Sequence, residues 1–169
     1  EAKADEIEKK FGPVHILVNN AGVGLQAGIV SGTYNDWDWG MGVNFWGPVY
    51  GSRTFIPRML KHGQGSHIVT TTSTDGVLLG TAGIYAVTKM AVSGLMEQLR
   101  HELRATNIGT SNLVPGMTTS NLGRSESEYR PESLKNDPVP TAAGAARPTG
   151  PRPARPPQPE TTPMWARPQ

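Results

Sequence analysis

Residues 83–95 read GIYAVTKMAVSGL. Tyr85 and Lys89 are four positions apart, and on a helix this spacing places both side chains on one face about one turn from each other. From about residue 83 to residue 104, apolar residues recur every three or four positions, at 84, 87, 91, 95, 99 and 103. This period predicts a helix. A phenol beside an ammonium suits acid–base chemistry, because the positive charge favours phenolate and lowers the phenol pKa.

Three segments around this helix have the composition of strands. Residues 16–19 (ILVN) form a short apolar run, and residues 65–73 (GSHIVTTTS) are rich in β-branched side chains. Residues 107–114 precede a Pro-Gly turn. Asp36 to about Lys61 is predicted as a further helix, with an interruption near Gly47-Pro48, because proline removes a backbone donor. Strands that alternate with helices predict an α/β fold with a parallel sheet covered on both faces, in three layers (α/β/α).

Three more features accompany the Tyr-Lys pair in a fixed order. An Asn-Asn-Ala-Gly turn at residues 19–22 follows the first strand, Asn44 lies on the following helix, and Ser73 ends the second strand. Over about residues 1–135 the chain resembles the classical short-chain dehydrogenase/reductase family, whose members are NAD(P)-dependent oxidoreductases on a Rossmann-like, doubly wound parallel sheet. The family's glycine-rich phosphate turn is not found in the chain. We therefore expect only the C-terminal catalytic half of the fold, with the first half preceding Glu1.

The resemblance implies a catalytic set of four residues. Tyr85 would exchange the proton, and Lys89 would lower its pKa and hydrogen-bond the nicotinamide ribose. Asn44 would distort its helix and hold a water linked to the lysine. Ser73 would donate to the substrate oxygen. The spacing from Ser73 to Tyr85 is one residue shorter than the commoner family spacing, and Thr72 would restore it. Either hydroxyl could therefore be the one that donates to the substrate oxygen, and Ser73 fits the strand motif better.

The same resemblance assigns residues to the cofactor. Besides Tyr85 and Lys89, they are Asn20, Ala21 and Gly22 beside the adenosine half, and Pro115, Gly116, Thr118 and Ser120 at the nicotinamide carboxamide. Thr118 stands where Val or Ile is usual and Ser120 where Thr is usual. The cofactor is NAD or NADP, because the residue that selects between them belongs to the part of the fold expected before Glu1.

The predicted function is interconversion of a secondary alcohol and a ketone by hydride transfer. The substrate would be a small apolar or aromatic molecule, in a site lined by Val77, Leu78, Leu79, Met117 and the loop that follows Met117. A fainter likeness, in the strand at His67 and in residues 120–122 (SNL), is to dehydrogenases that oxidise benzylic alcohols of lignin-type aryl ethers. The family suggests a homodimer or homotetramer.

Two alternatives remain for the function. One is a non-catalytic fragment that binds no cofactor. The other is an extended-type enzyme such as a sugar-nucleotide epimerase, which shares the Y-x-x-x-K motif but is disfavoured by the Asn-Asn-Ala-Gly turn.

Composition excludes several other classes of function. The pI near 9.1 comes from the tail: residues 1–137 carry 12 Lys/Arg and 13 Asp/Glu, whereas residues 138–169 carry four Arg and one Glu. The folded part therefore lacks the positive charge that nucleic-acid binding needs. There is no cysteine, the four histidines are scattered without metal-ligand spacing, and no apolar run could span a bilayer. We expect a cytoplasmic enzyme without a metal; a targeting signal stays open, since the chain does not begin with Met.

The tail differs in kind from the rest of the chain. Ten of the 32 residues in 138–169 are proline, and no apolar period is present. Such a segment cannot bury enough apolar surface to offset its ordering entropy, so we divide the chain into a partial catalytic domain (1–137) and a disordered tail (138–169). The GC-rich codons of Pro, Ala, Arg and Gly suggest a frameshifted reading of the gene. A Pro-rich ligand for SH3-like domains is the functional alternative.

Overall fold

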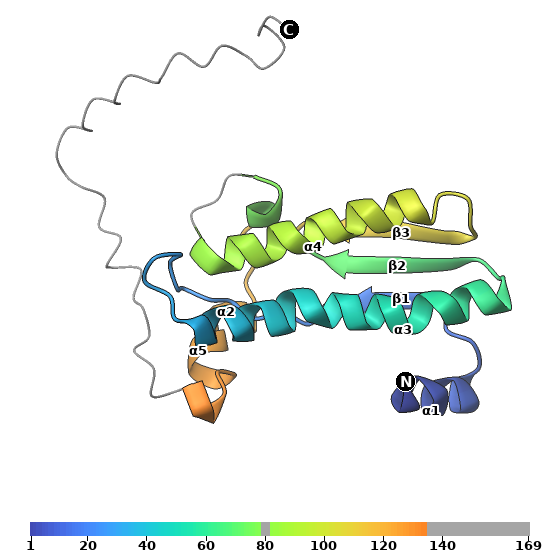
Figure 1. Ribbon diagram of the computed structural model, residues 1–169, viewed down its shortest axis with the longest axis horizontal. Helices are drawn as coiled ribbons and strands as arrows, with labels where there is room; N and C mark the ends of the chain where they lie inside the picture. The colour runs from blue at the N-terminus through green and yellow to red at the C-terminus, as the bar shows by residue number, and fades with distance from the viewer. Residues whose placement is uncertain (79–81, 135–169) are drawn as a thin grey trace, which may run out of the picture.

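A three-stranded parallel sheet lies at the centre of the molecule, in the order β1-β2-β3 (Figure 1). Its strands are β1 (Ile16–Asn19), β2 (Ser66–Thr71) and β3 (Ile108–Leu113), close to the predicted ranges. In the register, Val18 lies opposite Val69. Because all strands run in the same direction, their carboxyl ends meet at one edge of the sheet, which is where open α/β folds bind ligands.

This computed structural model describes residues 1–78 and 82–134. The predictions for the tail (138–169) and for Leu79 lie outside the described residues. Within them, no helix is long and apolar enough to cross a membrane.

Helices precede the first strand, connect the strands and follow the last one. They are α1 (Ala2–Phe11), α2 (Tyr34–Met41), the π-helix η1 (Gly42–Trp46), α3 (Gly47–His62), α4 (Gly83–Glu102) and α5 (Ser125–Glu128), with short 3₁₀ turns η2 (Thr74–Gly76), η3 (Asn121–Arg124) and η4 (Glu132–Leu134).

The long helix between β1 and β2 begins at a capping box. The Thr33 side chain accepts a hydrogen bond from the backbone N–H of Asp36, and the Asp36 side chain accepts one from the backbone N–H of Thr33. The predicted interruption is present, but it is the π-helical turn Gly42–Trp46. Pro48 follows this turn, and its missing N–H falls where the pairing changes from π-helical to α-helical.

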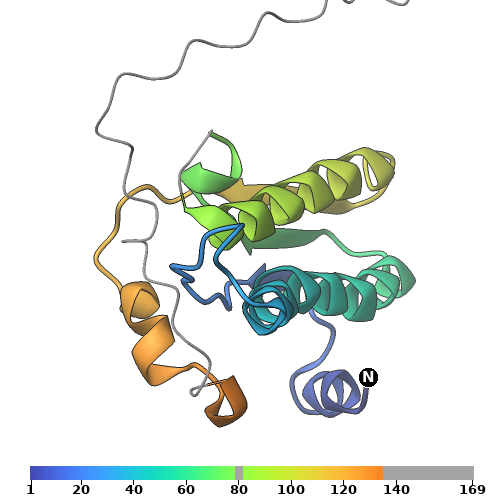
Figure 2. The ribbon, with the colours of Figure 1, turned by 60° about the vertical axis from the view of Figure 1, so that its left-hand side comes forward.

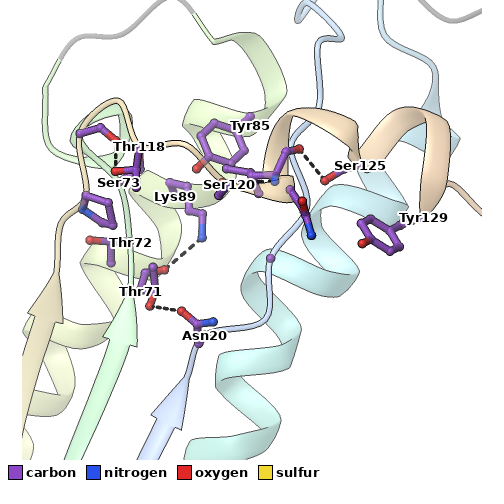
Figure 3. A pocket seen from close by; sticks show the side chains of 15 residues that line it. Asn20, Thr71, Thr72, Ser73, Tyr85, Lys89, Thr118, Ser120, Ser125 and Tyr129 are labelled. Carbon is purple, nitrogen blue, oxygen red and sulfur yellow. Dashed lines mark hydrogen bonds between the residues drawn. The ribbon is translucent and has the colours of Figure 1, made fainter.

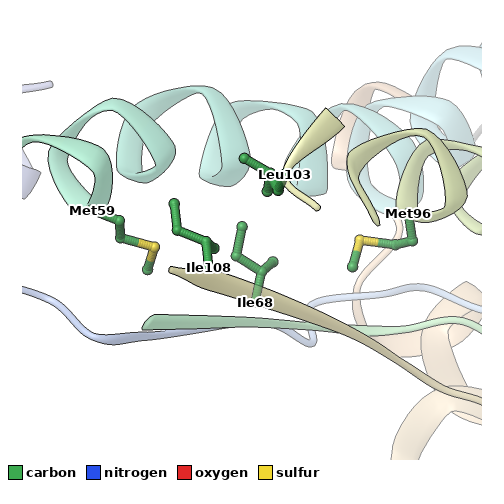
Figure 4. Close-up of a cluster of buried hydrophobic side chains, with 5 residues drawn as sticks. All are labelled: Met59, Ile68, Met96, Leu103 and Ile108. Atoms are coloured by element: carbon green, nitrogen blue, oxygen red, sulfur yellow. The ribbon is translucent and has the colours of Figure 1, made fainter. Parts of the chain in front are cut away.

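Helices α3 and α4 pack side by side on one face of the sheet (Figures 1 and 2). The main core lies between them and the strands (Figure 4), and consists of Met59, Ile68, Met96, Leu103 and Ile108. On the other face Ile16 is 66% exposed and Val18 56% exposed. Instead of covering that face, α1 is held to α3 by Arg58, which pairs with Asp5 and Glu8. The described residues thus form two layers of the Rossmann-like α/β fold.

Helix α4 buries a more polar face than its apolar period indicates. Val87 belongs to the apolar series but is exposed, whereas Thr88 and Lys89 are buried along with Val92. Packing of the sheet therefore uses only part of the apolar stripe. The polar part of the buried face points towards the carboxyl ends of the strands.

Candidate active site

A cavity of about 350 Å³ lies at the carboxyl ends of the three strands (Figure 3). Its walls come from the residues that follow each strand, from the first two turns of α4 and from the segment after β3. The residues that line it are Asn20, Gly22, Thr71, Thr72, Ser73, Tyr85, Lys89, Pro115, Gly116, Thr118, Ser120, Asn121, Leu122, Ser125 and Tyr129. The structure thus brings together every predicted catalytic and cofactor residue except Ala21 and Asn44.

Lys89 and Tyr85 face the cavity from one side of α4, as predicted. The Lys89 ammonium nitrogen lies 5.8 Å from the centroid of the Tyr85 ring and donates a 3.0 Å hydrogen bond to the Thr71 carbonyl. Both side chains are buried. Burial disfavours the charged ammonium and lowers the pKa of Lys89.

The pKa of the Tyr85 phenol is raised in this structure. Burial is the main cause, the neighbouring Ser73 hydroxyl opposes it, and the negative charge of Asp75 adds to it. Lys89 is not among the groups that shift this pKa, and its ammonium donates to the Thr71 carbonyl. The predicted lowering of the phenol pKa by Lys89 therefore stays a prediction.

The Asp75 carboxylate gives a test of this electrostatic arrangement. Asp75→Asn removes a negative charge that disfavours phenolate, so the pKa of Tyr85 should fall. In alcohol oxidation, which needs the phenolate, the rate should then rise at lower pH than in the wild type. The pH profile of kcat/KM measures this shift. Asp38→Asn, an exposed carboxylate on α2, is the matched control and should leave the profile in place; an equal shift in both variants would contradict the assignment.

The two rival hydroxyls have different partners. The Ser73 hydroxyl lies beside the Tyr85 phenol and lowers its pKa, and its Oγ accepts from the Asp75 N–H at 3.2 Å. Thr72 is 2% exposed, and its Oγ1 donates to the Leu113 carbonyl at 3.2 Å. This geometry supports Ser73 as the hydroxyl that acts with the phenol, because the Thr72 hydroxyl is occupied by the neighbouring strand.

Asn44 lies behind the cavity wall, in the π-helical turn. Its Oδ1 accepts from the Val23 N–H at 2.8 Å, and its Nδ2 donates to the Val23 carbonyl and to Thr88 Oγ1, both at 3.0 Å. The helix is distorted at Asn44, as expected. Here the side chain fixes the loop after β1, and its part in a proton relay stays a prediction.

Gly22 lies where that loop approaches Lys89. A Cβ at this position would lie 3.4 Å from the Lys89 ammonium nitrogen and 3.5 Å from Asn44 Oδ1. Any larger side chain would therefore displace one of these groups. Ala21, the neighbouring residue of the turn, is exposed and does not line the cavity.

The remaining predicted cofactor residues form the far wall. Asn20 Oδ1 accepts from Thr71 Oγ1 at 2.8 Å. Thr118 donates to the Gly116 carbonyl at 3.1 Å, and Ser120 caps η3 by accepting from the Leu122 N–H at 3.3 Å. The Thr118 hydroxyl can still accept a hydrogen bond from a group in the cavity, and the Ser120 hydroxyl can still donate one.

Besides Thr71 at the end of β2, four lining residues were not singled out in the sequence, namely Asn121, Leu122, Ser125 and Tyr129. They follow Ser120, whose capping position before a polar stretch is the only local signal. The predicted apolar lining was also different: Val77, Leu78 and Met117 are exposed and lie outside the cavity wall. They belong to loops that turn outward, whereas the actual apolar contact is Leu122.

Comparisons with known proteins agree with this geometry. Residues 1–131 match the family model of the short chain dehydrogenases. The chain is 41% identical over 130 residues to C alpha-dehydrogenase of Sphingobium sp. (strain NBRC 103272 / SYK-6), an alignment that covers 76% of this chain and 42% of that protein.

Solved structures show the same likeness. A short chain dehydrogenase/reductase from Burkholderia phymatum in complex with NAD superposes with a TM-score of 0.78 and 40% identity, over 84% of this chain and 53% of that one. A gluconate 5-dehydrogenase from Burkholderia cenocepacia J2315 in complex with NADP and tartrate gives 0.68 and 30%, over 75% and 50%. The chain spans about half the length of the relatives it matches. It belongs to the short chain dehydrogenase family.

Proposed function

We propose that this chain supplies the catalytic half of an enzyme that interconverts a secondary alcohol and a ketone with a nicotinamide cofactor. The observation that carries the proposal is the wall of the main cavity. There a buried phenol, Tyr85, lies beside the hydroxyl of Ser73 and one helical turn from the buried ammonium of Lys89.

Tyr85, Ser73 and Lys89 have different roles in this reaction. In alcohol oxidation the Tyr85 phenolate accepts the proton of the substrate hydroxyl, and in ketone reduction the phenol returns it. Ser73 donates to the substrate oxygen and holds it beside the phenol. Lys89 places a positive charge on the same wall and favours the phenolate once its ammonium turns towards Tyr85. A bound nicotinamide accepts or supplies the hydride.

The residues present fit such a cofactor. Lys89 is a buried ammonium with a carbonyl as its partner, so a ribose hydroxyl could replace or join that acceptor. Gly22 leaves room for close approach, and Thr118 and Ser120 offer hydroxyls on the opposite wall. Both NAD and NADP stay open, since one similar structure holds each.

We extend the proposal to the substrate class. The likeness of the strand at His67 and of residues 120–122 to dehydrogenases of benzylic alcohols supports a secondary alcohol next to an aromatic ring. A similar protein is named C alpha-dehydrogenase. An aromatic group would find Tyr129 and Leu122 in the cavity wall. We therefore expect benzylic secondary alcohols of aryl ethers to be oxidised faster than short aliphatic alcohols.

An assay of the active enzyme tests the proposal. NAD or NADP is mixed with aryl and aliphatic secondary alcohols, and formation of the reduced nicotinamide is followed by its absorbance. Ketone formation with either cofactor supports hydride transfer. Inversion of a sugar nucleotide without net reduction would favour an epimerase, and no nicotinamide binding by the chain in a titration would favour the non-catalytic alternative.

Ser73 and Thr72 provide the matched variants for the substrate-holding role. Ser73→Ala should lower kcat/KM about a hundredfold, on the scale of losing one preorganised donor. Thr72→Ala should leave kcat/KM within a few-fold of the wild type and destabilise the fold by about 1 kcal/mol, because it removes only a hydrogen bond to Leu113. Steady-state kinetics and thermal unfolding measure the two effects. The opposite ranking in kcat/KM would mean that Thr72 holds the substrate.

A further inference from the structure

A buried ion pair lies apart from Lys89. The Arg130 and Asp36 side chains are 1% and 0% exposed, and Arg130 Nη2 lies 2.7 Å from Asp36 Oδ1. Desolvation of two ions offsets much of their attraction, so a buried ion pair is a weak source of stability. Such a pair is better understood by what it holds in place.

Arg130 connects three parts of the chain. Its Nη2 pairs with Asp36 on α2, its Nη1 donates to Glu126 Oε2 on α5 at 2.7 Å, and its Nε donates to the Leu134 carbonyl at 3.0 Å. The guanidinium carbon lies 5.6 Å from the centroid of the Trp39 ring. The planar guanidinium can serve these directions together, which a lysine could not.

Asp36 is itself fixed by the start of α2. Its Oδ2 accepts from the backbone N–H and the hydroxyl of Thr33, at 2.8 and 2.9 Å, which leaves Oδ1 for Arg130. Burial alone would raise the pKa of Asp36, but the hydrogen bonds from Thr33 and the adjacent positive charge of Arg130 outweigh it and lower that pKa. The anchor on α2 therefore stays charged and well oriented.

Residues 120–134, which we name the covering segment, also touch the loop after β1. Ser125 Oγ accepts from the Gly24 N–H at 2.9 Å, and Glu126 Oε1 accepts from the Gln26 N–H at 3.2 Å. A Cβ at Gly24 would lie 2.7 Å from the Leu122 carbonyl oxygen, so the two backbones are in direct contact. The covering segment is thus fastened at both of its sides.

These contacts determine the surroundings of the catalytic phenol. Leu122 and Tyr85 line the main cavity and also a second cavity of about 140 Å³, whose wall includes Gln26 and Glu126. Leu122 and Leu134 pack against the apolar cluster that contains Tyr85. A shift of the covering segment would therefore change the space beside the hydroxyl.

We infer that Arg130 is a positioning residue, which binds Asp36 and Glu126 to hold the covering segment over Tyr85 and so fixes the shape of the substrate cavity. The expected effect of Arg130 on the kinetics rests on the proposed function. The contact that Arg130 maintains between the covering segment and the loop at Gly24 and Gln26 is independent of that function.

The test uses a neutral triple variant of the active enzyme, Asp36→Asn, Glu126→Gln and Arg130→Met. Removing all three charges avoids leaving an unpaired buried ion, and a neutral replacement of a buried ion network is often tolerated. The Asn oxygen can still accept from the Thr33 N–H and keep the helix cap. Arg124→Met is the control, since Arg124 forms an exposed ion pair with Glu128 in the same segment.

Two measurements are made on each variant. Hydrogen exchange of the Gly24 and Gln26 amides should become about tenfold faster in the triple variant, because their acceptors are no longer held. The value of kcat/KM should fall about a hundredfold, mostly through KM, because the substrate is misplaced while the reacting groups are intact. Arg130→Lys should lie between the triple variant and the wild type. The control should change neither measurement.

The outcomes separate this inference from the proposed function. Faster amide exchange in the triple variant, found together with no alcohol oxidation by the wild type, would support the positioning of the covering segment by Arg130 and contradict the proposed function. Unchanged exchange, or faster exchange with unchanged KM in an active enzyme, would overturn the positioning role. If the triple variant does not fold, Arg130→Lys decides, and wild-type exchange and KM in that variant would overturn the inference as well.

Discussion

Replacing Tyr85 with phenylalanine is expected to abolish turnover and leave the affinity for the nicotinamide cofactor nearly unchanged. The ring packs in an apolar cluster with Val23, Leu25 and Trp39, and phenylalanine keeps these contacts. Only the hydroxyl that exchanges the proton is lost. General acid–base catalysis contributes about 10²- to 10⁴-fold, so kcat should fall by at least a factor of about 1,000.

Single-turnover kinetics and a cofactor titration measure the two quantities. Tyr129→Phe is the matched control: this second phenol also lines the cavity but is 54% exposed and has no assigned proton transfer. It should keep kcat within a few-fold of the wild type. Activity of Tyr85→Phe near the wild-type level, or a loss shared equally by Tyr129→Phe, would remove Tyr85 from the mechanism.

Much of this site follows from local sequence. The strands were predictable because β-branched and apolar runs end at Gly- or Pro-containing turns, and the residues after parallel strands must gather at one edge of the sheet. The spacing of Tyr85 and Lys89 placed both on one helical face. These are short-range rules, and they hold wherever the backbone is regular.

Other parts depend on contacts that are distant in sequence. Arg130 and Asp36 are 94 positions apart, and nothing near either residue indicates a buried partner. The apolar period of α4 predicts that Val87 is buried, but Val87 is exposed and Thr88 is buried instead. The reason is related, since a helix that borders a cavity buries polar groups. The phenol pKa also depends on burial and on Asp75, which spacing alone does not reveal.

Substitution of Lys89 by methionine should produce the second large effect, in both turnover and cofactor binding. The ammonium is assigned two tasks, favouring phenolate and holding the ribose. Loss of the first should lower kcat about a hundredfold or more. Loss of a charge-assisted hydrogen bond, worth about 1.5–3 kcal/mol, should weaken cofactor binding at least tenfold.

The same substitution should not lower the melting temperature. Burial lowers the pKa of Lys89, which means that the fold disfavours its charge. Methionine has a similar length without that charge, and the Thr71 carbonyl that loses its donor lines the cavity, where water can reach it. Lys61→Met, an exposed lysine on α3, is the control and should change neither activity nor binding.

The pH dependence of stability provides an independent check on Lys89. Between its lowered folded pKa and its ordinary pKa, the unfolded chain binds more protons at this group than the folded chain does. The stability contributed by this group therefore rises with pH through that window, and the wild type should gain free energy of unfolding relative to Lys89→Met as the pH increases. Thermal unfolding of both proteins across the window measures the difference. A difference that stays constant with pH would mean that Lys89 is not desolvated, and a turnover defect with intact cofactor affinity would reject its role at the ribose.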